Sequence, residues 1–468
     1  MSVRGPLGAT PQSAGVELTR APSLDVREAP AVSSRRALLA IAGLLTTGLV
    51  ISISAANTQT LLPLSIRLAV PPTLAGAFGN AGLNLHSGGA IAVLILMTAC
   101  YTIVAVLAGE LSTRTVLMAI AALNAVVLLA PPLVSTDVFS YQAYARMGSL
   151  FGTNPYLSGP HALGIGDPVF PYIGSKWSYI PSVYGPAFTM LSYLLAPLAI
   201  GASVLVYKSI ATVSSLGIVA LVFNAARLRG VNPVRAAALV GLNPLLVIYG
   251  VGGGHNDLLM LLAMVAAVYA ILRSRERLGG ALTVLAIGVK LTAGILLPFA
   301  IAAGGPLRGR GRRRDLLIGV GASFAVLGSL TLALFGPGVM NLMSTIERSQ
   351  SEGDWHSLPG VLSTRLGMVT IGHVVGYLLA AAFVVVFVWL VRRVWRGELD
   401  WIDGAGWATA AMLVAASSLL PWYVAWLLPF AALSSDRRLF RTALVITCVV
   451  QGVELLGYIP HGFSLHGL

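Results

Sequence analysis

The chain has 468 residues, of which 56% are apolar and 10% are charged, and its mean hydropathy is +0.84. Soluble proteins carry about 25% charged residues, so this composition excludes an ordinary soluble domain. The net charge of +13 does not indicate nucleic-acid binding, because the arginines lie in short clusters between apolar runs, as in a positive-inside topology signal. We predict an all-α polytopic membrane protein with about 11–13 transmembrane helices, since helices satisfy their own backbone polar groups in lipid.

The N-terminal residues 1–36 are rich in proline, serine, alanine and charge, which predicts a disordered cytoplasmic tail. Residues 37–468 then form the transmembrane domain. The apolar run at residues 37–56 lies too far from the start for a signal peptide, so we expect it to be a retained span. Arg35 and Arg36 place the N-terminus on the cytoplasmic side of the plasma membrane, and spans at 90–108 and 116–133 bring the chain outside.

The first polar feature follows these spans, in the stretch PPLVSTDVFSYQAYARMG at residues 131–148. Asp137 stands just past a span end, where low dielectric is expected to raise the pKa of its carboxyl group. Tyr141 and Tyr144 follow at helical spacing. Asp137 also lies at the head of a predicted extracytoplasmic loop at residues 134–185, which is long enough to be functional and also holds Asn154 and Tyr184. Helix capping by Asp137 is the alternative.

A second polar group follows a glycine run in GVGGGHND, residues 250–257. His255, Asn256 and Asp257 start the next predicted helix, whose first backbone N–H groups form a ready anion site. A plain glycine turn with Asn256 or Asp257 as the helix cap is the alternative. A turn alone does not require three adjacent glycines and a histidine.

Lys290 is the third polar feature, and it lies inside the apolar residues 278–303. Arginine clusters at both ends of this stretch belong to the same side, so we predict a hairpin of two short helices with Lys290 near its outer apex. A lysine in such a stretch usually faces a polar interior or a water-filled site. Snorkelling of its ammonium group to the membrane interface is the alternative.

Three further candidates lie in the C-terminal third of the chain. His356 belongs to a second predicted outer loop at residues 337–369, and Trp422 and Tyr423 belong to the short outer segment PWYVAW. We predict that the histidine contacts a sugar or phosphate and that the aromatic rings contact a sugar face or an isoprenoid chain. An incidental loop histidine and an interfacial aromatic belt are the alternatives.

Several chemistries are disfavoured by missing motifs. The sequence has no Walker loop, Rossmann fingerprint, zinc-protease helix or serine-hydrolase elbow, and its two cysteines lie inside apolar runs without metal-ligand spacing. Asp257 and Asp137 together offer oxygen ligands for Mg²⁺ or Mn²⁺. Lysine and histidine alone can neutralise a phosphate leaving group, so we expect no obligatory metal and no other cofactor.

Five stretches, taken in order, carry a resemblance to a known family: TDVFSYQAYARMGSLFGTNPY, VYGPAF, NPLLVIYGVGGGHNDLLM, VKLTAGILLPF and PWYVAW. Together they resemble the polyprenol-phosphomannose-dependent α-1,6-mannosyltransferases of actinobacterial lipomannan synthesis, which are membrane glycosyltransferases of the GT-C fold. The resemblance implies a GT-C helical bundle with a catalytic aspartate in its first large outer loop, matched here by Asp137. It also implies a polyprenyl-phosphomannose donor from the outer leaflet and a mannoside acceptor, a glycolipid or mannan of the cell envelope, joined through an α-1,6 linkage.

The chemistry of such an inverting transfer needs one base for the acceptor hydroxyl, a pocket for the departing phosphate and a path for the lipid. We predict Asp137 as the base, with Lys290 and His255 near the phosphate. Another polyprenyl-phosphate sugar, arabinose or glucose, is an alternative donor. A lipid or sugar transporter is the alternative of a different class, because intramembrane charges and broken helices also mark transporters.

Overall fold

The structure of the protein is a computed structural model that describes residues 1–2, 35–79, 81–303, 310–351 and 356–459. The tail predicted at residues 1–36 therefore lies almost wholly outside the described residues. The described part contains helices and no strand, which confirms the all-α prediction.

The α-helices are α1 (Arg35–Ser54), α2 (His86–Leu107), α3 (Thr113–Leu128), α4 (Asp137–Phe151), α5 (Pro186–Tyr193), α6 (Ile200–Arg229), α7 (Pro233–Gly241), α8 (Asp257–Leu272), α9 (Glu276–Val289), α10 (Leu296–Ala302), α11 (Arg310–Phe335), α12 (Asn341–Ser351), α13 (Leu358–Gly360), α14 (Val369–Trp395), α15 (Trp401–Ala415), α16 (Leu428–Leu433) and α17 (Arg437–Leu456). The short helical segments are η1 (Ala55–Asn57), η2 (Gln59–Leu61), η3 (Leu64–Ile66), η4 (Pro72–Leu74), η5 (Ala108–Glu110), η6 (Pro160–Leu163), η7 (Phe170–Tyr172), η8 (Ser175–Trp177), η9 (Leu245–Val251), η10 (Leu291–Ile295), η11 (Gly336–Met340), η12 (Val361–Arg365) and η13 (Pro421–Trp426).

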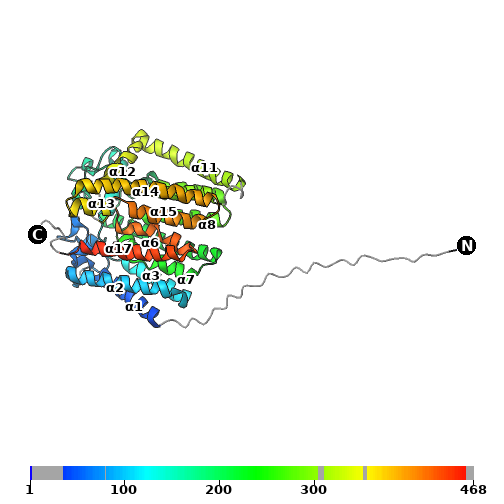
Figure 1. Ribbon diagram of the computed structural model, residues 1–468. Coiled ribbons are helices and arrows are strands. Elements are labelled where there is room, and N and C mark those ends of the chain that lie inside the picture. Colours follow the sequence, from blue (N-terminus) through cyan, green and yellow to red (C-terminus); the bar gives the residue numbers. More distant parts are fainter. Residues whose placement is uncertain (3–34, 80, 304–309, 352–355, 460–468) are drawn as a thin grey trace.

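Most of the long helices run side by side in one bundle (Figure 1). Six of the described helices are long and apolar enough to cross a membrane, and the bent pair α7 and η9 makes a seventh if it is counted as one span. Four shorter apolar segments accompany them, among them α3 and α8. The polytopic membrane class is confirmed, whereas the count of 11–13 spans stays a prediction, because it requires the shorter segments to cross as well.

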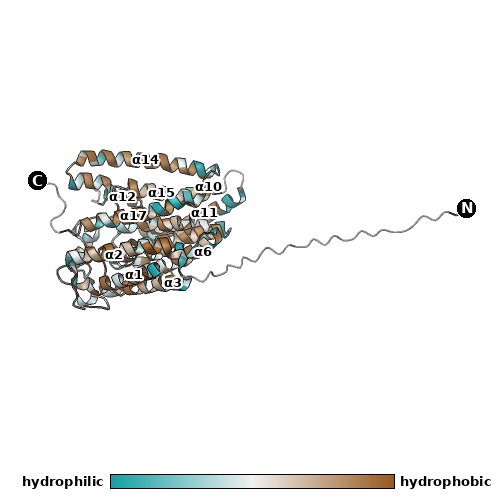
Figure 2. Ribbon diagram, turned by 60° about the horizontal axis from the view of Figure 1, so that its bottom comes forward, coloured by the Kyte–Doolittle hydropathy of each residue, from teal (hydrophilic) through white to brown (hydrophobic). Residues whose placement is uncertain are grey.

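Helices α11 and α14 form an apolar outer face of the bundle. Almost all of the α14 span is exposed, and Figure 2 shows hydrophobic residues along its length. Val385 is 70% exposed and Phe324 of α11 is 69% exposed. Apolar surface of this extent is unfavourable in water and is expected in contact with lipid.

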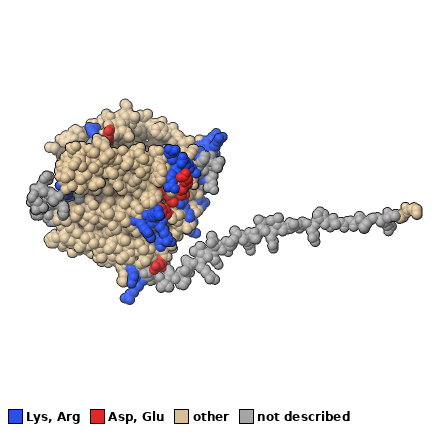
Figure 3. All heavy atoms as spheres, viewed as in Figure 1, with Lys and Arg blue, Asp and Glu red and all other residues tan. Residues whose placement is uncertain are grey.

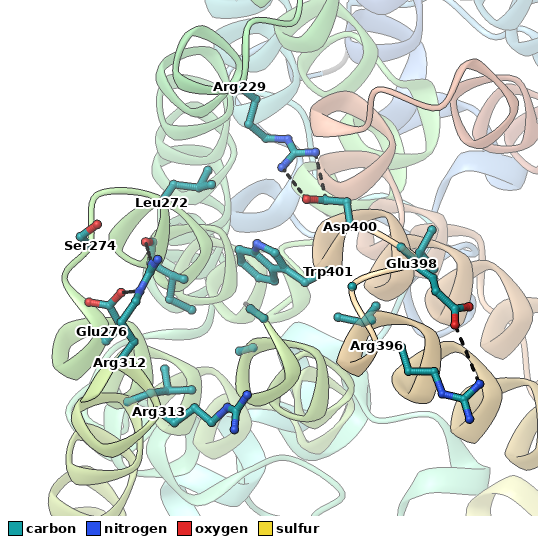
Figure 4. Close-up of a pocket in the computed structure, with 17 residues that line it drawn as sticks. Arg229, Leu272, Ser274, Glu276, Arg312, Arg313, Arg396, Glu398, Asp400 and Trp401 are labelled. Atoms are coloured by element: carbon teal, nitrogen blue, oxygen red, sulfur yellow. Dashed lines mark hydrogen bonds and ion pairs between the residues drawn. The ribbon is translucent and has the colours of Figure 1, made fainter. Parts of the chain in front are cut away.

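Most of the charged side chains visible in Figure 3 gather at one end of the bundle, at the right of the view. Here the ends of α6, α8, α10 and α14 and the starts of α9, α11 and α15 surround a pocket of about 750 Å³ (Figure 4). Arg229 forms a double contact with Asp400 at 3.0 and 3.2 Å, and Arg312 pairs with Glu276. Arginines from three separate chain segments, Arg229, Arg312 and Arg396, therefore line one pocket.

The residues that line this pocket show how the chain runs on either side of Lys290. Glu276 at the start of α9 and Ala303 just after α10 both line it, so the chain turns back between these two helices. Lys290 lies in the break between α9 and η10, away from the arginine-rich end. The predicted hairpin of two short helices is confirmed, whereas the outer position of Lys290 stays a prediction.

Candidate functional site

Asp137 is placed by a short segment, residues 131–136, that connects α3 to α4. Two prolines at its start cannot continue α3, and Val134 adopts a left-handed backbone conformation with φ of 62°. The backbone N–H of Leu133 donates to Gly252 O at 3.0 Å, and that of Val134 donates to Leu61 O at 3.0 Å. The segment is therefore fixed from two sides.

Asp137 itself is the first residue of α4 rather than its cap. Thr136 occupies the cap position and makes no side-chain capping bond, while Ser135 Oγ accepts a bond from the Asp137 backbone N–H at 3.2 Å. The Asp137 side chain turns to His255, with Oδ2 lying 3.2 Å from Nδ1, and the Tyr141 hydroxyl lies 3.5 Å from the same oxygen. The carboxylate is 23% exposed, whereas the His255 side chain is fully buried.

The pKa of Asp137 differs from the sequence-based expectation. Burial raises this pKa, but the close contact with His255 and the charge of Lys290 lower it below its ordinary value of 3.8. The expectation of a raised pKa is wrong, because it took account of the low dielectric and not of the basic groups that the fold brings close. Asp137 is thus a carboxylate at neutral pH.

The glycine run before His255 has a steric reason. A side chain at position 253 would place its Cβ 2.7 Å from His255 Nε2, and Gly254 adopts φ of 65°. Glycine at these positions lets the imidazole fold back against the turn. The ring then stacks on Trp422, with centroids 3.6 Å apart and planes 19° from parallel.

Asp257 and Lys290 form a second charged pair beside the first. Lys290 Nζ donates to both carboxylate oxygens of Asp257, at 2.8 and 2.9 Å, and Trp426 Nε1 donates to Oδ1 at 2.8 Å. The ammonium group also lies 4.6 Å from the centroid of the Tyr423 ring. Lys290 is held by these partners, which argues against snorkelling to an interface.

Tyr141 and Asn256 support the two pairs from behind. The Tyr141 hydroxyl accepts from the Asn256 backbone N–H at 3.2 Å and lies 3.4 Å from Asn256 Oδ1. The Tyr141 ring packs edge-on against Tyr184 and Phe188, with centroids 4.7 Å away in both cases. Because both Tyr141 and Asn256 are buried, their contacts position the neighbouring Asp137 and Asp257.

A cavity of about 1130 Å³ opens over these pairs. Its polar lining includes Asp137, Lys290, Tyr184, Tyr423 and Trp426. Its apolar lining comes mainly from three helices, α12, α14 and α15, with these contributions: Met343, Ile346, Ala380, Phe383, Met412 and Leu413. The cavity therefore joins a charged end to an apolar wall beside the lipid-facing helix α14.

His356 also lines this cavity, and its Nε2 lies 2.5 Å from Glu454 Oε2 on α17. Glu454 in turn accepts a bond from the Tyr458 hydroxyl at 3.0 Å. The histidine is thus fixed by the last span, a partnership that the sequence pattern did not reveal.

The remaining predicted residues lie behind the cavity wall. Tyr144 donates to Ile180 O at 2.7 Å, and the Asn154 amide donates to Phe335 O at 2.7 Å while its Oδ1 accepts from the Tyr156 backbone N–H. Trp422 is buried under His255. These three side chains stabilise the loop and the histidine, so we do not include them among substrate contacts.

The geometry of the acids bears on a metal ion. In the described ranges, no group of three or more histidine, cysteine, aspartate or glutamate residues is arranged to hold a metal. Both oxygens of Asp257 accept hydrogen bonds from Lys290, and Trp426 also donates to one of them. The negative charge of Asp257 is therefore paired with the Lys290 ammonium group.

Sequence reasoning missed Trp426, Arg365 and Lys208. Trp426 binds Asp257, and Arg365 lines the cavity. Lys208 is buried in α6 and contacts the segment that leads to Asp137. A lysine within an apolar span is itself a signal, and the rule that selected Lys290 also selects Lys208.

Comparison with known families gives matches over most of the chain. Residues 40–304 match the family described as alpha-(1->6)-mannopyranosyltransferase, N-terminal domain, and residues 355–465 match the family described as MptB C-terminal domain. The first match alone covers more than half of the chain.

Curated relatives agree with these matches. The chain is 29% identical to an alpha-(1->6)-mannopyranosyltransferase of Mycobacterium tuberculosis over 70% of its own length and 66% of the relative. It is 29% identical to alpha-(1->6)-mannopyranosyltransferase A of the same organism, over 71% of its own length and 68% of the relative. It is 26% identical to alpha-(1->6)-mannopyranosyltransferase B of Corynebacterium glutamicum, over 72% of its own length and 61% of the relative. The chain thus spans about two thirds of the length of these relatives.

Proposed function

The chain belongs to the alpha-(1->6)-mannopyranosyltransferase family of glycosyltransferases, and from this we propose that it transfers mannose from polyprenyl-phosphomannose to a mannoside acceptor. The acceptor is a glycolipid or mannan of the cell envelope, and the product linkage is α-1,6. The observation that carries this proposal is the cavity with Asp137 and Lys290 at one end and an apolar wall along the rest.

The base of this reaction is Asp137. Its lowered pKa keeps it ionised, and it is the partly exposed member of its pair with His255. It takes the proton of the acceptor hydroxyl as the acceptor oxygen bonds to the anomeric carbon. The bond between that carbon and the phosphate oxygen breaks, and polyprenyl phosphate leaves with the electron pair, so the configuration inverts.

The leaving phosphate is received by Lys290. Its side chain lines the cavity, and its positive charge acts on Asp137. A phosphate bound there offsets that charge, so the pKa of Asp137 rises when donor is bound. The base becomes stronger in the complex in which it is needed.

The aromatic and apolar parts of the cavity complete the donor site. Tyr184, Tyr423 and Trp426 offer ring faces for the sugar, and His356 offers a polar contact on the opposite wall. The aliphatic lining from α12, α14 and α15 suits an isoprenoid chain that enters from lipid beside α14. The site then faces the extracytoplasmic side of the plasma membrane, opposite the arginine clusters.

The donor is tested with purified protein and a panel of synthetic prenyl-phosphate sugars carrying mannose, glucose or arabinose, with an α-mannoside acceptor. We expect transfer from the mannose donor alone, with an α-1,6-linked product identified by nuclear magnetic resonance. Transfer of glucose or arabinose but not mannose contradicts the proposed donor. Movement of intact lipid-linked sugar across vesicles without transfer indicates a transporter instead.

A further inference from the structure

Lys208 is a buried cation that the proposed reaction does not use. It lies in the span α6 with 1% exposure, it is one of three lysines in the chain, and within the described ranges no carboxylate pairs with it. Its Nζ donates to Pro131 O at 3.1 Å, to Val127 O at 3.0 Å and to Ala130 O. An ammonium group has three N–H donors, and here each meets one backbone carbonyl.

The backbone around these carbonyls offers few donors. Helix α3 ends at Leu128, and the last carbonyls of a helix have no partner within it. The Ala130 backbone N–H donates to Val127 O at 3.2 Å, but Pro131 and Pro132 have no backbone N–H and cannot donate to the carbonyls before them. A cation also interacts favourably with the negative end of a helix dipole. Lys208 therefore closes α3 at the point where the chain leaves it.

The same side chain touches the turn that presents His255. A Cβ at position 254 would lie 3.4 Å from Lys208 Cγ and 2.7 Å from Val138 Cγ1. The Lys208 stem thus passes beside Gly254, one residue before His255, while its ammonium group holds the start of the segment 131–136. One side chain connects the two chain segments whose ends form the Asp137–His255 pair.

We propose that Lys208 is a positioning residue, which holds segment 131–136 in register so that the Asp137 carboxylate stays on His255 and faces the cavity. This role rests on the proposed function of Asp137 as base. Lys208 does not line the cavity, so it acts through Asp137 and does not contact the donor. Loss of its three donors lets the segment shift, and a displacement of about 1 Å at a reacting group costs about 100-fold in rate.

The test compares Lys208→Met with Thr212→Val as the matched control. Thr212 lies one turn further along α6, is also buried, and donates its hydroxyl to Lys208 O at 2.8 Å. For Lys208→Met we expect kcat to fall about 100-fold with an unchanged KM for the mannose donor. The acid limb of the kcat/KM profile is expected to move to higher pH, because Asp137 loses its alignment with His255. Thr212→Val is expected to keep the wild-type values.

A double variant distinguishes a positioning role of Lys208 from general destabilisation of the protein, because the two losses in kcat are then not additive. If Lys208 acts through Asp137, the double variant Lys208→Met with Asp137→Asn is no slower than Asp137→Asn alone. Should Lys208→Met not yield folded protein, Lys208→Gln keeps two amide donors, and we expect it to give an intermediate kcat and an intermediate shift of the acid limb.

The outcomes distinguish the two proposals. Wild-type kcat in Lys208→Met or Lys208→Gln, or losses that multiply with Asp137→Asn, overturns the positioning role while the base assignment stands. Full turnover in Asp137→Asn overturns the base assignment itself, and the role of Lys208 with it.

Discussion

The carboxylate of Asp137 lies 3.2 Å from Nδ1 of His255, although the two residues come from distant parts of the sequence. The contact lowers the pKa of a partly buried carboxyl group that burial alone would raise. It also directs the side chain of a helix-start residue away from the capping position and toward the cavity.

Replacing His255 by phenylalanine tests this contact. The ring stacking on Trp422 is kept, but the polar contact with Asp137 is lost, so the effect of burial increases and the pKa of Asp137 rises. For the wild type we expect kcat/KM to stay level as pH falls from about 7 to about 5, because a carboxyl with a lowered pKa stays ionised there. In His255→Phe the decline begins at higher pH.

The matched control for this profile is His161→Phe. His161 belongs to residues 134–185, the predicted outer loop that begins beside Asp137. It stacks on Tyr179, but it is exposed. Its replacement is expected to leave the acid limb in place. An unshifted limb in His255→Phe contradicts the proposed control of Asp137 by His255.

Variants of Lys290 and Asp257 separate the effect of this pair on stability from the effect of Lys290 on donor binding. Lys290→Met leaves Asp257 buried and unpaired, which costs about 3–5 kcal/mol of stability for a buried pair. The double variant Lys290→Met with Asp257→Asn removes both charges, so we expect it to recover much of the melting temperature. It still lacks the phosphate partner, so the donor KM stays about 10–100-fold above wild type.

Thermal unfolding and donor titration of the two variants check this pair. Recovery of donor affinity together with stability contradicts the phosphate role of Lys290, because it reduces the lysine to a structural partner of Asp257.

The apolar wall of the cavity predicts a dependence on the length of the donor chain. Ala380→Trp on α14 fills part of the lining, so KM is expected to rise for long polyprenyl donors and to change little for donors with a short prenyl chain. Val385→Trp is the matched control, since Val385 lies on the same helix and is 70% exposed. Equal effects of the two substitutions on the long-chain donor rule out the wall as the prenyl site.

The orientation of the bundle is tested by labelling single cysteines in protein that lacks Cys100 and Cys448. Ile165→Cys lies in the loop after α4 and is exposed, and we expect an impermeant thiol reagent to reach it from outside. Ser274→Cys lies at the arginine-rich end and lines its pocket, and labelling is expected only after the membrane is opened. The reverse pattern contradicts the proposed extracytoplasmic site.

Much of this arrangement could be predicted from the sequence by one physical rule. A charged side chain among apolar residues is costly, so it is expected to have a polar partner or a functional role. The rule selected Asp137 and Lys290, and the arginine clusters around residues 278–303 predicted the hairpin. It was not applied to Lys208, which lies inside the apolar helix α6. The partners of Lys208 are backbone carbonyls, which carry no sequence signal.

The contacts within the site were beyond sequence reasoning for a different reason. The stacking of His255 on Trp422 and the bond from Trp426 to Asp257 join segments far apart in the chain. Both depend on the tertiary packing of the short segment η13, not on a local pattern. For this reason Trp422 was predicted as a substrate contact, although it lies buried beneath a histidine.

The proposed role of Asp137 as the base of a mannosyl transfer is tested by the turnover number of purified Asp137→Asn with polyprenyl-phosphomannose and an α-mannoside acceptor. Asp315→Asn is the control, because that carboxylate pairs with Arg277 at the opposite end of the bundle. We expect a loss of about 100- to 10,000-fold in kcat for Asp137→Asn, with wild-type turnover in the control. Full turnover in folded Asp137→Asn would contradict the proposed role.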